Sequence, residues 1–456
     1  MKKSILLVAV ILTIIVTLPV IGNSFMKKMI DTRLVELKSH GLSTNNDTDK
    51  SDYLHTFRHF EFAVQDSPKF LKYLNTFSDK QIPPYVNAML KGAIVGMDVE
   101  YNNLPFAKGL SIEIYPLTLS ENIVKAIKDE DLTFYSYIDN FLRLKGILYH
   151  INYNVTSKSF DGYLKDIKES YTLKDGTNLE LELKEALFSG SGYLVAPDRL
   201  SMKIKKIDFG VQNKMITFEF TLGKFKSLSS FESASTYLSS IDLNNMQFML
   251  KDKNENLLLT SQDTKINFSA NTQGKKAEFN TKSSIKELTF HTSKENISLK
   301  KFKYDIAVNG VDKTTLERLR VLATQRQTKH QVNAEIVKAG IDVISHGLEI
   351  NISELSIKNI TLNEKEDLKG FHIKSALKIK EDLELASKIN LSPLLLVDDV
   401  DLDINIKLSN EIYNKIMQDI PMTSSISSYA NVDDSDTVFD VTYANGALKI
   451  NGKDLQ

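Results

Sequence analysis

Two histidines, His55 and His59, stand four residues apart, the spacing that pairs metal ligands on one face of a helix. The intervening residues lack the glutamate that follows the first histidine in that motif, and the segment runs directly into the strand-like sequence FEFAV. We therefore expect surface or partly packed histidines here, and no metal ligands.

A second candidate is the order Asp401, Asp403 and Asn405, which resembles the start of a calcium-binding loop. Such a loop needs glycine at its sixth position and an acid at its twelfth, where this chain has Ile406 and Ile412. The same acids fall on the polar phase of an alternating segment. The pattern thus predicts solvated side chains on a strand.

The glycine-rich segment around Ser191, FSGSGYL, is neither a nucleophile elbow nor a phosphate-binding loop, and we expect a bulge or bend. No nucleophile, base and orienting acid lie close together in the sequence. We assign no catalytic, metal-binding or cofactor-binding residues and expect no cofactor. A catalytic triad assembled from distant segments stays open.

Composition excludes several functional classes. The 456 residues are 42% hydrophobic and 25% charged, which suits a globular chain with a sizeable core. With 57 basic and 58 acidic residues the net charge is -1, so the cation surplus that grips nucleic acid is missing. The absence of cysteine excludes disulfides and thiolate metal sites.

The first 24 residues predict a membrane anchor. Lys2 and Lys3 precede an apolar run from Ile5 to Ile21, long enough at about 1.5 Å per residue to cross the hydrocarbon of a bilayer. Gly22 and Ser24 offer a poor cleavage site, so an uncleaved anchor is favoured over a cleavable signal peptide. A single early apolar segment followed by a long chain without a second one is typical of a single-pass protein with an exported domain.

Four further segments follow the anchor (1–24). Residues 25–52 predict a juxtamembrane helix and then a polar linker from Gly41 to Asp52. Residues 53–311 predict an N-terminal β-rich lobe with helices, 312–347 a helical insertion, and 348–456 a C-terminal antiparallel β lobe. No repeat of regular period is evident.

Apolar and polar residues alternate in many segments, which is typical of antiparallel strands with one apolar and one wet face. The fold class we predict is mainly β (α+β): a large curved antiparallel sheet, or a β-sandwich or groove, with a few helices. The expected apolar face, of a groove or a core, comprises Ile216, Phe218, Phe220, Leu222, Phe302, Tyr304, Ile306, Leu402, Ile404 and Ile406.

The predicted helices are too few to cover this apolar surface. A second sheet, curling of the sheet or an apolar ligand must then cover it. A sealed core would suit a structural or interaction protein, whereas an open groove lined by Leu, Ile and Phe would suit lipid acyl chains. The sequence does not separate these outcomes.

The closing segment, Val438 to Leu455, resembles the C-terminal signature of the YdgA-like family of bacterial envelope proteins. It reads as a hairpin with Asn445 and Gly446 in a type I′ turn, followed by Asn451, Gly452 and Lys453. The resemblance implies an envelope location: a single-pass inner-membrane protein whose bulk lies in the periplasm of a Gram-negative bacterium. It also implies a β-rich architecture similar in outline to AsmA-type proteins associated with phospholipid transport. It supplies no catalytic residues.

The expected function is non-enzymatic envelope maintenance by binding or passing lipid or another apolar ligand. An envelope interaction scaffold with a sealed core is one alternative, as a homodimer or with other envelope proteins. A hydrolase with a spatially assembled site is the other. Expected partners are the membrane, through the N-terminal segment, and lipid, but no nucleic acid.

Overall fold

The computed structural model describes residues 23–24, 26–76, 85–104, 109–193, 196–233, 235–324, 329–363, 366–385, 388, 399–419 and 427–454. The chain is mainly β, with antiparallel pairing and a few helices, as predicted. It divides into two compact units, Met1–Lys214 and Met215–Gln456. The division lies between residues 214 and 215, about a hundred residues before the helical insertion.

The first unit is an antiparallel meander in which consecutive strands pair from β1 to β6. The long strand β8 pairs with β7 through its first half and with β6 through its second half, and its other edge pairs with β9. The strands are β1 (Leu42–Ser51), β2 (His55–Val64), β3 (Ile94–Asn102), β4 (Gly109–Thr118), β5 (Tyr149–Asn154), β6 (Ser159–Leu164), β7 (Ile167–Thr172), β8 (Asn178–Tyr193) and β9 (Ala196–Gln212).

A helix over residues 26–39, predicted from its apolar spacing, packs on this sheet. Met26 and Leu34 are buried against Phe60, Val99 and Tyr101 of β2 and β3. These side chains form the core of the first unit next to the expected anchor. In the described part of the chain, no helix is long and apolar enough to cross a bilayer, and residues 1–22 of the expected anchor lie outside that part.

The segment expected to be a polar linker is instead a strand. Residues 42–51 form β1, which pairs with β2 through a bulge between Asn45 and Thr48. Most of its side chains are exposed. The prediction failed because the strand gains its backbone hydrogen bonds from β2 without burying an apolar face, so its sequence shows no hydrophobic alternation.

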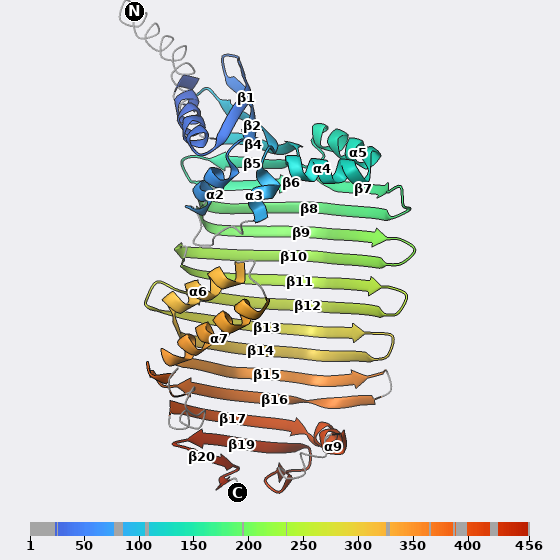
Figure 1. Ribbon diagram of the computed structural model, residues 1–456, viewed down its shortest axis with the longest axis vertical. Coiled ribbons are helices and arrows are strands. Elements are labelled where there is room, and N and C mark those ends of the chain that lie inside the picture. Colours follow the sequence, from blue (N-terminus) through green and yellow to red (C-terminus); the bar gives the residue numbers. More distant parts are fainter. Residues whose placement is uncertain are drawn as a thin grey trace, which may run out of the picture. The chain divides into compact units, whose positions relative to one another are not determined.

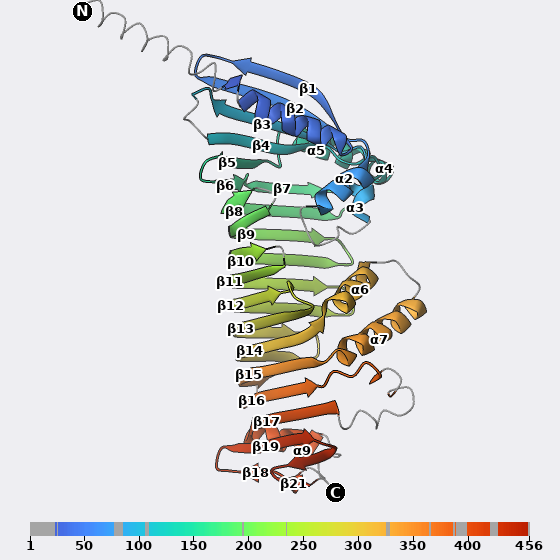
Figure 2. The ribbon, with the colours of Figure 1, turned by 90° about the vertical axis from the view of Figure 1, so that its left-hand side faces the viewer.

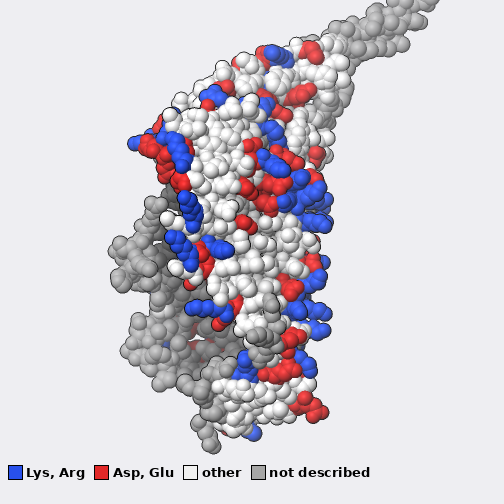
Figure 3. Space-filling model, turned by 90° about the vertical axis from the view of Figure 1, so that its right-hand side faces the viewer, with Lys and Arg blue, Asp and Glu red and all other residues white. Residues whose placement is uncertain are grey.

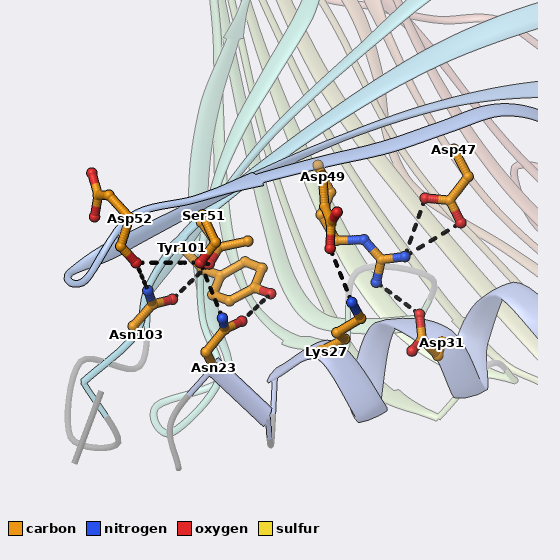
Figure 4. A network of polar contacts seen from close by, with 11 residues as sticks. Asn23, Lys27, Asp31, Asp47, Asp49, Ser51, Asp52, Tyr101 and Asn103 are labelled. Atoms are coloured by element: carbon orange, nitrogen blue, oxygen red, sulfur yellow. Dashed lines mark hydrogen bonds and ion pairs between the residues drawn. The ribbon is translucent and has the colours of Figure 1, made fainter. Parts of the chain in front are cut away.

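Polar contacts fasten the helix of residues 26–39 to β1 and β2 (Figure 4). The guanidinium of Arg58, only 4% exposed, donates to Asp31 of the helix at 2.7 Å and to Asp47 of β1 at 3.2 Å. Lys27 pairs with Asp49 at 2.9 Å. Tyr101 donates to Asn23 at 3.0 Å, so the contacts extend to the first described residues. The helix is therefore held by charge as well as by packing.

Four shorter helices lie between the strands of the first unit. Asp131 begins the last of them by accepting hydrogen bonds from the backbone amides of Thr133 and Phe134. Phe141 of that helix packs against Ile167 and Leu183. The helices are α2 (Ser67–Asn75), α3 (Tyr85–Leu90), α4 (Glu121–Glu130) and α5 (Leu132–Arg143).

The second unit is also an antiparallel meander, from β10 to β17 and on through β19, β20 and β21, with β18 pairing on β19. Its strands are β10 (Thr217–Ser233), β11 (Thr236–Lys251), β12 (Asn256–Asn271), β13 (Lys276–His291), β14 (Asn296–Asp312), β15 (Leu348–Leu362), β16 (Glu366–Ile379), β17 (Val400–Ser409), β18 (Asn431–Val432), β19 (Asp436–Ala444), β20 (Ala447–Ile450) and β21 (Lys453–Asp454). The β19–β20 turn confirms the predicted type I′ hairpin, with φ of 50° at Asn445 and 77° at Gly446.

The predicted helical insertion forms two helices, α6 (Lys313–Thr324) and α7 (Lys329–Ser345), which lie on one side of the strands of the second unit (Figures 1 and 2). Leu316, Val343 and Ile344 pack on Ala277, Val311 and Leu348 at one end of the strands. At another place α9 (Asn410–Asp419) brings Tyr413 within 6.0 Å of the Phe439 ring of β19.

Alternate long strands share a feature that we call the midstrand reversal. One residue near the middle of β8, β10, β12 and β14 has a left-handed backbone: Glu185, Lys224, Asp263 and Lys301, with φ between 46° and 54°. In β12 the hydroxyl of Ser261 contacts that of Thr264, although two residues separate them and strict alternation would put them on opposite faces. Residues 262 and 263 thus share the other face, and the alternation changes phase across them.

The reversal recurs at a regular interval. Strands β8, β10, β12 and β14 begin at residues 178, 217, 256 and 296, an interval of 39 or 40 residues. The left-handed residues keep nearly the same interval. The structure therefore contains a repeating hairpin unit, contrary to our expectation that the chain has no regular period.

We predict that removing the two acids that contact Arg58 lowers the free energy of unfolding more than removing Arg58 itself. Replacing both carboxylates (Asp31→Asn with Asp47→Asn) should lower the free energy of unfolding by about 3 kcal/mol, because it leaves a buried cation without an acid partner. Arg58→Met should cost only about 1 kcal/mol, because the two half-exposed carboxylates return to water. Urea unfolding of the variants measures both values, and an equal loss would contradict the asymmetry.

A second prediction concerns the midstrand reversal. Lys301→Val should destabilise the chain by about 1–2 kcal/mol, because a β-branched residue resists a left-handed backbone. Lys300→Val is the matched control on the neighbouring exposed residue and should change stability by less than about 0.5 kcal/mol. Equal unfolding midpoints for the two variants in urea would show that residue 301 needs no special conformation.

Candidate functional site

The apolar face of the second unit is built from rows of side chains that pair in register from strand to strand. We name each row after its residue in β14. The Tyr304 row comprises Ser227, Ile241, Ile266, Ser283, Tyr304, Leu355, Ile373, Ile406 and Phe439. The Ile306 row comprises Ser229, Ser239, Phe268, Thr281, Ile306, Ile352, Ser375, Ile404 and Val441. The Val308 row comprises Phe231, Tyr237, Ala270, Phe279, Val308, Ile350, Leu377, Leu402 and Tyr443.

Two further rows lie beyond the midstrand reversal. The Leu299 row comprises Leu222, Met246, Ser261, Leu288, Leu299, Ile360 and Leu368. The Ile297 row comprises Phe220, Phe248, Leu259, Phe290, Ile297 and Leu362. The Ser261–Thr264 contact places both sets of rows on one face of the sheet.

The structure brings the predicted apolar residues into these rows. Tyr304 and Ile406 share one row, and Ile306 and Ile404 share the next. Leu402 lies in the Val308 row. Phe302 pairs with Ile285 and directly follows the left-handed residue Lys301. The β10 residues lie across the reversal: Leu222 and Phe220 in the two further rows, Phe218 opposite Leu250, and Ile216 just outside the strand.

The five rows are uncharged and incompletely covered. They contain no Lys, Arg, Asp or Glu. None of the ten predicted residues is fully buried; Ile216 is 44% exposed, and the other nine are half-buried. All described strands of the second unit belong to one hydrogen-bonded sheet, so within that part no second sheet seals the face. A large apolar surface left partly open is typical of a binding surface.

Aromatic rings form a track along one margin of this face. Ring centroids of Phe231 and Tyr237 lie 6.0 Å apart, those of Tyr237 and Phe268 5.8 Å, and those of Phe268 and Phe279 6.5 Å. Across the reversal, Phe218 and Phe248 meet edge to face at 5.4 Å. Neighbouring aromatics at these separations attract each other and present a rigid apolar surface.

Charged residues lie elsewhere. On the side seen in Figure 3, Lys, Arg, Asp and Glu side chains gather along the margins, and uncharged side chains fill the band between them. At the midstrand reversal, on the face opposite the apolar rows, Asp263 accepts from Lys286 at 3.1 Å and from Asn244 at 2.9 Å. The sequence did not reveal this polar group, Asn244, Asp263 and Lys286, because its members lie some twenty residues apart.

A hollow of about 550 Å³ lies at one end of strands β10 to β14. Its lining includes Ser230, Leu238, Ser269, Asn280 and Ala307, which pair in register between the apolar positions. The lining also includes Tyr237, Ala270 and Phe279 of the Val308 row, so the hollow adjoins the apolar rows.

A second candidate site is a charged cluster in the first unit. Asp98 of β3, 7% exposed, accepts from Lys145 at 2.6 Å and from Tyr115 at 3.1 Å, and lies 2.6 Å from the Nδ1 atom of His59. Lys145 also donates to Glu113 at 2.8 Å. Gly96 makes room for the Tyr115 ring, since a Cβ there would lie 2.3 Å from it.

The pKa values in this cluster follow its contacts. Burial acts to raise the pKa of Asp98, but hydrogen bonds from Lys145 and His59 outweigh it and hold the pKa below its ordinary value. Burial and the nearby Asp98 charge raise the pKa of Tyr115 to about 12. Lys145 has a raised pKa, because its hydrogen bonds to Asp98 and Glu113 outweigh the effect of burial. At neutral pH Asp98 and Lys145 are therefore charged and paired with each other, and the Tyr115 hydroxyl keeps its proton.

The cluster therefore fastens the segment after α5 to the sheet, and we assign it no reaction. His55 and His59 lie on strand β2, where four residues span about 13 Å, so the helical spacing that pairs metal ligands is not formed. In the described residues no group of His, Asp and Glu is arranged to hold a metal ion. Asp401 and Asp403 lie on strand β17, as predicted. Ser191 adjoins the expected bulge in β8.

Comparison with known proteins gives no match: no family model matches the chain, and neither does any curated protein or solved structure.

The cluster predicts an acid-dependent loss of stability. Asp98→Asn should cost about 2 kcal/mol at pH 7, because it removes the charge that Lys145 and His59 contact. A lowered carboxyl pKa contributes stability that is present above its ordinary value of about 3.9 and is lost below it. The difference between wild type and variant should thus shrink as the pH falls through 4.

Urea unfolding between pH 7 and about pH 2.5 measures this difference. Glu113→Gln is the control. Its carboxyl is more exposed than that of Asp98, so it should cost less than about 1 kcal/mol. A difference for Asp98→Asn that stayed constant with pH would show that the carboxylate charge contributes nothing.

Proposed function

We propose that the chain is a membrane-anchored envelope protein that binds or passes lipid, or another apolar ligand, on the apolar face of its second unit. In this proposal residues 1–24 anchor the chain in the inner membrane, the remainder faces the periplasm, and the activity is non-enzymatic. The resemblance of Val438–Leu455 to the YdgA-like family favours the same location.

One observation carries the proposal: the rows, rich in Leu, Ile, Val and Phe, run in register across six to nine strands, are uncharged and are mostly half-buried. An acyl chain that lay along them would remove apolar surface from water, at roughly 25 cal/mol per Å². Helices α6 and α7 cover only one end of the strands. The remaining surface matches the apolar lining of lipid sites.

The two alternative functions have less support. A scaffold that pairs through strand edges would use a flat apolar edge, but β1 is polar, charged and bulged, which discourages such pairing. A hydrolase needs a nucleophile beside a base, and the groups of the Asp98 cluster contact one another instead.

We predict that lipid can be crosslinked to the apolar rows in living cells. The photoreactive residue p-benzoylphenylalanine at position 306, on the apolar phase of β14, should yield a lipid adduct after irradiation. The same residue at position 305 is the matched control, because Asp305 lies on the opposite phase of that strand and pairs with Lys282. Mass spectrometry of the purified full chain detects the adduct.

An adduct at 306 alone supports the proposal. Adducts at both positions would indicate chance contact with the membrane, and adducts at neither, with the full chain found in the membrane fraction, would remove lipid binding on this face. Recovery of the chain in the soluble fraction would instead contradict the anchor.

A further inference from the structure

Serine and threonine side chains are concentrated in one region of the apolar rows. In β10 to β13 the rows carry Ser227, Ser229, Ser239, Thr281 and Ser283, which we call the hydroxyl patch. From β14 to β19 the same rows are aliphatic or aromatic apart from Ser375. The patch therefore distinguishes one end of the apolar face from the other.

Some hydroxyls in and beside the patch pair with each other. The hydroxyls of Ser229 and Ser239 contact each other at 2.8 Å, and those of Ser261 and Thr264 do the same at the midstrand reversal. Ser283 is different: its side-chain oxygen is buried, has no hydrogen-bond partner, and belongs to a residue only 3% exposed. Its cross-strand neighbours are Ile266 and Tyr304.

A buried hydroxyl without a partner is unfavourable, because it has lost water and gained nothing in exchange. An alanine or valine at position 283 would fit the apolar row without that cost. A partner that enters the face can recover the lost hydrogen bond. The absence of charged side chains from the rows indicates that the part of the ligand lying there is neutral.

We infer that the hydroxyl patch binds the neutral ester group of an acyl lipid, with the Ser283 hydroxyl donating to the ester carbonyl and the acyl chain lying along the rows toward β14 and β15. This inference rests on the proposed function and adds to it a ligand class and a direction. A charged headgroup then lies beyond the rows.

The chain has no tryptophan, so a single one provides an unambiguous optical probe. Ile306→Trp places it in the row beside Tyr304, which pairs with Ser283. The full chain with this substitution is titrated with two brominated quenchers of equal chain length, methyl dibromostearate and dibromooctadecane. Both bring bromine to the probe, and they differ only in the ester.

The ester should quench at about fivefold lower concentration than the hydrocarbon, the effect of one hydrogen bond. Adding Ser283→Ala should abolish this preference and leave hydrocarbon quenching unchanged. Ser375→Ala is the matched control, a serine of the Ile306 row outside the patch, and should keep the preference.

The failures are distinguishable. Quenching by neither compound would overturn the proposed function itself. Equal quenching by both compounds, or an ester preference that survives Ser283→Ala, would overturn the hydroxyl patch as the ester site while leaving lipid binding intact.

Discussion

The alternation of side chains along a β-strand is the constraint on which this structure depends. Successive residues point to opposite faces, so a strand of 16 or 17 residues keeps one face apolar only while its sequence follows the same phase. Here the phase changes once in each long strand, where two adjacent residues such as Gln262 and Asp263 share the polar face. In β8, β10, β12 and β14 a left-handed residue, Asp263 or its equivalent, lies at this change. Without it, the rows on either side of the reversal would lie on opposite faces.

The sequence predicted the components of this face but not how they join. Alternation was evident from Ile216 to Leu222, from Phe302 to Ile306 and from Leu402 to Ile406, and each run is half of a strand or one short strand. Strict two-residue alternation ends at the reversal, because the apolar phase changes there. The two halves of β10 therefore showed no common pattern. The hairpin interval of 39 or 40 residues was hidden for the same reason, since it is kept by backbone conformation more than by residue identity.

Other features were beyond sequence reasoning because they depend on distant residues. The Asp98 carboxylate is contacted by His59, Tyr115 and Lys145, which the order of strands brings together. Strand β1 exists because β2 lies beside it, not because its own sequence is apolar. By contrast, the helix of residues 26–39 and the Asn445–Gly446 turn were predictable, because local spacing and turn chemistry determine them.

The central claim is that one apolar face continues through the midstrand reversal and is open to lipid. A nitroxide scan along β14, one residue at a time from 297 to 308 in the membrane-embedded full chain, tests it most directly. The account predicts protection from a water-soluble nickel chelate at 297 and 299, exposure at both 300 and 301, and protection at 302, 304, 306 and 308. Unbroken alternation through 300 and 301, or equal exposure to the chelate at every position, would contradict it.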